Sequence, residues 1–181
     1  TGDATTQLRD EYGRHTLGQS CLMARLLVEA GVRCVLVHHS DWDTHNDNFH
    51  MLKDRLLPKL DTAMATMFRD LSDRGLLEKT FVLVTGEFGR TPRINKDAGR
   101  DHWGPSTAIA VGGGGVKNGI VVGDSGPRAE RPVTTPYGPE DLAATIYRSM
   151  GIDPQTLFYT PEGRPVSIVP HGGRVIGELF S

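Results

Sequence analysis

The chain has 181 residues, of which 38% are hydrophobic, enough for one domain of ordinary size with an apolar core. Its formal net charge is −2 with both signs interspersed, which argues against nucleic acid or an anionic membrane surface as the partner. No apolar run approaches the roughly 20 residues of a membrane span, so we expect none.

The first forty residues predict a helix followed by a buried strand. Residues 1–13 are polar and carry no clear pattern. Apolar side chains recur at helical spacing from Leu17 to Val28, and Gly31 follows where a left-handed cap is common. Residues 33–38 are rich in branched apolar side chains, which is typical of a strand buried on both faces.

A cluster of acids and histidines follows this predicted strand. Asp41, Asp43 and His45 lie within five residues, so their side chains can converge on one divalent cation. Taken alone, the same stretch is equally compatible with a solvated polar loop. Mixed carboxylate and imidazole ligation suits zinc or manganese, whereas an oxygen-dominated set suits calcium or magnesium.

The middle of the chain repeats the pattern of a strand that ends in polar residues. Residues 52–75 predict a long amphipathic helix that Pro58 kinks or restarts, and residues 80–85 predict a second buried strand before Glu87. A strand, a helix and a strand in this order favour a right-handed crossover with parallel strands. The polar residues after both strands would then lie at one edge of the sheet.

The next loop is long and rich in charge, so it is a candidate for function. Arg90, Arg93 and Arg100 have the donor geometry to bind phosphate or sulfate, although a structural ion pair is the competing interpretation for each. His102 precedes a predicted strand at residues 107–111 and could ligate a metal or be fixed by its neighbour Asp101.

The remaining pattern completes an α/β prediction. Residues 120–123 suggest an edge strand, residues 139–150 a helix closed by Gly151, and residues 166–169 and 175–179 short extended pieces. We therefore expect a single α/β domain over residues 1–181, with a parallel-rich sheet flanked by helices.

Four phrases of the sequence together resemble a known superfamily. They are Trp42-Asp43-Thr44-His45, Gly86-Glu87-Phe88-Gly89-Arg90-Thr91-Pro92, Gly99-Arg100-Asp101-His102-Trp103 and Asp141-Leu142-Ala143-Ala144-Thr145-Ile146. With these phrases the chain resembles a sulfatase-like bacterial family of unknown function within the alkaline phosphatase superfamily. The resemblance implies an alkaline phosphatase-like fold, a two-metal site at the sheet edge, and an exported or periplasmic location.

The resemblance also implies roles for individual residues. In relatives an Asp and a His four residues apart bind one metal, as Asp41 and His45 would, while the closer family retains the acid that matches Asp43. His102 would complete that site, and Glu87 would approach a second metal. Phe88 stands where relatives place a further ligand, which weakens the case for a complete two-metal site.

Two functions follow from this resemblance. The first is a metal-dependent hydrolase of sulfate or phosphate esters, acting on a small-molecule or carbohydrate substrate. The second is a catalytically degenerate member that serves as a binding or structural module. The superfamily's nucleophile has no counterpart before Asp41, so we expect this chain to be the C-terminal portion of a larger domain.

Overall fold

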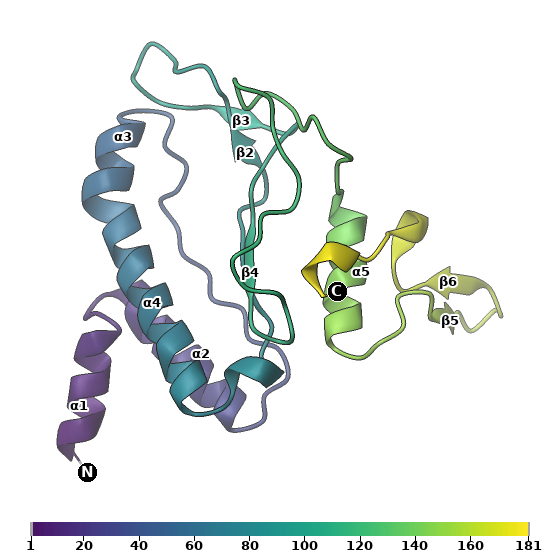
Figure 1. Ribbon diagram of the computed structural model, residues 1–181, viewed down its shortest axis with the longest axis horizontal. Coiled ribbons are helices and arrows are strands. Elements are labelled where there is room, and N and C mark those ends of the chain that lie inside the picture. The colour runs from purple at the N-terminus through teal and green to yellow at the C-terminus, as the bar shows by residue number, and fades with distance from the viewer. Residues whose placement is uncertain (1, 181) are drawn as a thin grey trace. The chain divides into compact units, whose positions relative to one another are not determined.

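The computed structural model describes residues 2–180, which form two compact units (Figure 1). Unit 1 runs from the N-terminal residues to Thr80 and includes Phe88–Gly104. Unit 2 comprises Phe81–Glu87 and the residues from Pro105 onward. None of the helices within residues 2–180 is both long enough and apolar enough to cross a membrane.

Helices dominate unit 1. Helices α1 (Gly2–Glu11), α2 (Thr16–Glu29) and α4 (Leu57–Asp73) pack together, and a short 3₁₀ helix (Leu77–Lys79) follows. Their core is apolar and is built from Tyr12, Leu17, Cys21, Leu22 and Ala63. The predicted helix before Gly31 is confirmed as α2, whereas α1 was missed because its sequence is polar.

Pro58 shapes the second long helix as expected. Helix α3 (Asn48–His50) leads into a π-helix (Met51–Leu56) and then into α4, which has Pro58 in its first turn. Proline lacks the N–H donor and its ring crowds the preceding turn, so the regular ladder of hydrogen bonds is interrupted there. The predicted restart at Pro58 is confirmed.

A buried ionic cluster joins α2 to α4. Arg25, only 2% exposed, places its Nε 2.7 Å from Asp70 Oδ2, in an ion pair that is not aligned as a hydrogen bond. The Tyr12 hydroxyl donates to the same carboxylate at 3.0 Å, and Arg74 Nε donates to it at 2.6 Å. Burial and the nearby Asp70 charge raise the pKa of Tyr12.

The predicted parallel-rich sheet is wrong. Residues 33–38 are extended but have no ladder partner among residues 2–180, and the Leu36 side chain is 90% exposed. Only one side of this segment is covered, with Val37 against the helical core. A run of branched residues indicates extended backbone, but it does not supply a neighbouring strand.

Every described ladder is a short antiparallel pair. In unit 2, β1 (Val82–Val84) pairs with β4 (Ala110–Gly112), and β5 (Leu157–Tyr159) pairs with β6 (Pro165–Ser167). In unit 1, β2 (Gly89–Arg90) pairs with β3 (His102–Trp103). Parallel strands need a long, usually helical crossover, which the loop-rich connection between β1 and β4 does not contain. The alkaline phosphatase-like α/β fold is therefore corrected to a small mixed fold.

Besides these strands, unit 2 contains one α-helix, two short 3₁₀ helices and a small apolar core among the described residues. Helix α5 (Pro139–Ser149) confirms the prediction for that segment, with Pro139 in its first turn. Short 3₁₀ helices lie at Pro170–Gly172 and Gly177–Leu179. Val116, Ile176 and Leu179 form the core, whereas the predicted strand at residues 120–123 is irregular.

Candidate metal centre

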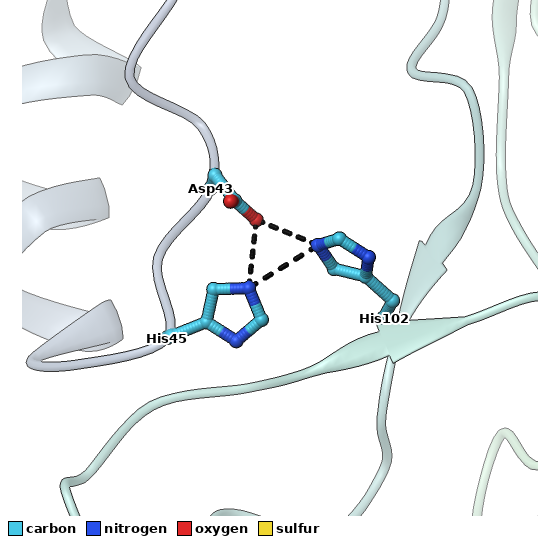
Figure 2. Close-up of side chains that lie close together, drawn as sticks. All are labelled: Asp43, His45 and His102. Atoms are coloured by element: carbon cyan, nitrogen blue, oxygen red, sulfur yellow. Dashed lines mark hydrogen bonds and ion pairs between the residues drawn. The ribbon is translucent and has the colours of Figure 1, made fainter.

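Two segments of unit 1 bring the candidate ligands together. Asp43 and His45 lie in the loop that follows the extended segment, and His102 lies on β3 (Figure 2). His102 is directly opposite Arg90 in the β2–β3 ladder. Opposed residues of an antiparallel pair project to the same face, so both side chains can reach Asp43.

The three donor atoms of this Asp43–His45–His102 cluster form a small triangle. Asp43 Oδ1 lies 3.0 Å from His45 Nε2 and 2.8 Å from His102 Nε2, and the two Nε2 atoms are 3.2 Å apart. A cation about 1 Å above the plane of such a triangle would be about 2 Å from all three atoms, the ligand distance of zinc. Figure 2 shows the carboxylate and both imidazole rings turned toward one point.

Backbone hydrogen bonds hold the two ligand-bearing segments against each other. Arg100 N donates to Thr44 O at 3.1 Å, and Asn48 N donates to Ala98 O at 3.0 Å. Gly99 lies where the segments approach most closely: a Cβ added there would be 1.7 Å from the His45 carbonyl oxygen. Only glycine fits at this point without moving the backbone that carries His45.

Electrostatics keep the Asp43 carboxylate ionised. Contacts with His102 and with Arg90, whose Nη2 donates to Oδ1 at 2.6 Å, lower the pKa of Asp43 to about 2. The side chain is 63% exposed, so a cation from solvent can reach it. Above about pH 3 this group offers a charged oxygen ligand.

Aromatic packing supports the other side of the cluster. The Phe88 ring lies 4.2 Å from the His102 ring, centroid to centroid, and the Arg90 guanidinium lies over Phe88 at 5.9 Å. Phe88, which stands where the resemblance implied a further metal ligand, thus packs against His102. This contact limits the orientations open to that imidazole.

Asp101 contacts a different histidine from the one its sequence position suggested. Its Oδ1 lies 2.7 Å from His45 Nδ1, whereas His102 is directed at Asp43. Asn95 also donates to Asp101 Oδ1, at 3.1 Å. The sequence predicted a contact of Asp101 with its neighbour His102 and gave no role to Asn95, although Asn and Gly residues in a loop indicate a turn held by side-chain hydrogen bonds.

The other predicted site residues are not among the three residues of the cluster. Asp41 is exposed with a left-handed φ of 76°, and Glu87 belongs to unit 2. Arg100 donates through Nη1 to the Thr91 and Pro92 carbonyls. Arg93 is exposed and lines a surface pocket with Asn95 and Asp101. Among the three predicted arginines, Arg90 has a described contact with the cluster, through Asp43.

Comparison with known proteins places the chain in one family. Residues 1–180 match the family described as "Protein of unknown function (DUF1501)", and the chain belongs to it. No curated protein and no solved structure matches the chain. The assignment to the alkaline phosphatase superfamily is therefore corrected, since neither that superfamily nor a sulfatase family is matched and the strands are antiparallel.

Proposed function

We propose that unit 1 binds a single divalent transition-metal ion through Asp43, His45 and His102. One observation supports this most directly: three donor atoms from two separate segments lie 2.8–3.2 Å apart. Hydrogen bonding alone uses such a cluster poorly, because each imidazole Nε2 either donates or accepts. A cation can accept all three lone pairs together.

The donor set favours zinc or manganese among the metals. Two imidazole nitrogens and one carboxylate oxygen suit zinc, whereas calcium and magnesium prefer sites made of oxygen ligands. The same two-histidine, one-carboxylate set also serves mononuclear iron(II), so iron belongs in the metals tested. With three ligands on one side, a bound ion would keep open positions for water or another small ligand.

Metal binding is tested by titrating the purified 181-residue chain, stripped of metal, with Zn²⁺, Mn²⁺, Fe²⁺, Ca²⁺ and Mg²⁺ in a calorimeter. We expect one Zn²⁺ per chain, weaker Mn²⁺ or Fe²⁺ binding, and no comparable Ca²⁺ or Mg²⁺ binding. The double variant His45→Ala, His102→Ala should lose the zinc site. Absence of zinc binding by the wild-type chain, or unchanged binding by the double variant, would contradict the proposal.

A control variant distinguishes zinc binding at this cluster from zinc binding by exposed histidines elsewhere in the unit. His50 is 78% exposed, belongs to the same unit and has only a long 3.7 Å contact with Asp47. His50→Ala should therefore bind zinc as the wild type does. Hydrolysis of phosphate or sulfate esters stays an untested prediction from the sequence, because the geometry that supports this proposal concerns binding and not turnover.

A further inference from the structure

We infer that Asp101 and Asn95 act as positioning residues for His45, fixing the tautomer and orientation in which its Nε2 is free to bind a cation. This inference rests on the proposed metal site. Asp101 Oδ1 is 2.7 Å from His45 Nδ1, on the opposite side of the ring from Nε2. An ionised carboxylate only accepts hydrogen bonds, so Nδ1 carries the proton, and in the neutral imidazole the lone pair is then on Nε2.

Asn95 holds both partners of this contact. Its Nδ2 donates to Asp101 Oδ1 at 3.1 Å and to the His45 carbonyl oxygen at 2.9 Å. Its Oδ1 accepts from the backbone N–H groups of Asp97 at 3.0 Å and Gly99 at 2.9 Å. All four hydrogen-bonding positions of the Asn95 amide are thus used. They connect the loop around Asn95 to the backbone of His45 and to the carboxylate of Asp101.

Hydrogen bonds also fix the backbone of Asp101, which limits how far its carboxylate can move with the His45 ring. Asp101 N donates to Thr91 Oγ1 at 3.0 Å, and Thr91 N donates to Asp101 O at 2.8 Å. Gly99 permits the close contact with the His45 carbonyl. The His45 ring is therefore held at Nδ1, while its Nε2 lies beside Asp43 and His102.

Three substitutions in the full chain test the inference by zinc affinity, measured in competition with a chelator. Asp101→Ala removes the acceptor and should weaken zinc binding by roughly 10- to 100-fold, the usual effect of losing a carboxylate behind a ligating histidine. Asp101→Asn keeps an acceptor oxygen of the same shape and should weaken it less. Asp97→Asn makes the same charge change in the same loop and should leave the affinity unchanged, because Asp97 contacts Asn95 through its backbone.

A spectroscopic measurement separates positioning from general loosening of the loop. In ¹⁵N-labelled protein with zinc bound, the imidazole nitrogen shifts should show His45 ligating through Nε2 in the wild type and in Asp101→Asn. Asp101→Ala should give a mixture of Nε2 and Nδ1 ligation. Wild-type zinc binding with unchanged affinity and unchanged nitrogen shifts in Asp101→Ala would overturn this inference alone, whereas absence of zinc binding by the wild type would overturn the proposed function.

Discussion

Unit 1 contains two carboxylate-centred clusters that differ in burial and in the chemistry of their donors. Asp70 has a side chain that is 8% exposed and is surrounded by two guanidinium groups and a phenol. Asp43 is 63% exposed and faces two imidazoles and one guanidinium. Guanidinium and phenol groups keep their protons near neutral pH, but an imidazole can give up a proton and become a ligand.

This difference separates a structural role from a binding role. The partners of Asp70 are Tyr12 between α1 and α2, Arg25 on α2, and Arg74 directly after α4. Tyr12 and Arg25 are buried, so the cluster stabilises one arrangement of these helices. The partners of Asp43 come from loops and a short hairpin at the surface, where a cation can replace their shared protons. An aspartate carboxylate is therefore suited to a structural role when its partners are buried and keep their protons, and to metal binding when its partners are exposed imidazoles.

The largest effect is expected from breaking the buried cluster. Asp70→Ala removes the buried one of the two carboxylates that pair with Arg25 and leaves Arg25 with the more exposed Glu29, and removing one partner of a buried pair costs about 3–5 kcal/mol. Urea unfolding followed by circular dichroism should show this loss of unfolding free energy. Asp73→Ala, an exposed carboxylate on the same helix, serves as the control and should leave the transition nearly unchanged. A loss no greater than in Asp73→Ala would show that the buried cluster is not structural.

Zinc should stabilise the fold through the exposed cluster by a smaller amount. A ligand that binds only the folded state at 100 times its dissociation constant adds about 2.7 kcal/mol to the free energy of unfolding. The wild-type chain should therefore melt at a higher temperature in zinc, and the variant His45→Ala, His102→Ala should not. An equal rise in both proteins would place the stabilising metal elsewhere in the chain.

Acid should weaken the buried cluster over a defined pH range. Burial alone would raise the pKa of Asp70, but hydrogen bonds from Arg74 and Tyr12 and the charge of Arg25 outweigh it, so the pKa is lowered below its ordinary value of 3.8. A lowered folded-state pKa contributes stability that is present above pH 3.8 and is lost as pH falls through the folded value. Unfolding free energy measured from pH 6 to pH 2 should fall less steeply in Asp70→Asn than in the wild type. Equal slopes would contradict this assignment.

The sequence predicted local features of the molecule better than long-range ones. Helical periodicity and capping located α2 and α5, and Pro58 marked the change of helix type, because these depend on neighbouring residues. Strand pairing depends on residues far apart in the chain. The branched residues at 33–38 therefore could not show whether another strand pairs with this segment, and none does within residues 2–180. Without a partner for this segment the predicted parallel-rich sheet does not form, and the predicted α/β fold class is wrong for that reason.

The candidate site shows the same division. Residue type and spacing selected Asp43 and His45 together with Asp41, which is not part of the cluster, while His102 was selected with the help of a resemblance that the comparisons do not support. Asp101 and Asn95 could not be assigned to His45 from the sequence, since they contact it across 56 and 50 positions of the chain. Nor could the sequence show that Arg90 contacts Asp43 while Arg100 binds backbone carbonyls.

The smallest effect on stability is expected from Asp43→Asn in metal-free protein. Asp43 is exposed and its partners are at the surface, where ion pairs contribute little because water already solvates both charges. The urea midpoint should therefore match the wild type within error, while zinc affinity falls because the charged oxygen ligand is lost. A loss of stability comparable to that of Asp70→Ala would mean that the Asp43 carboxylate is a structural anchor for its loop even without metal. The contrast between the two clusters would then fail, and the hydrogen-bonded triangle would need no cation to explain it.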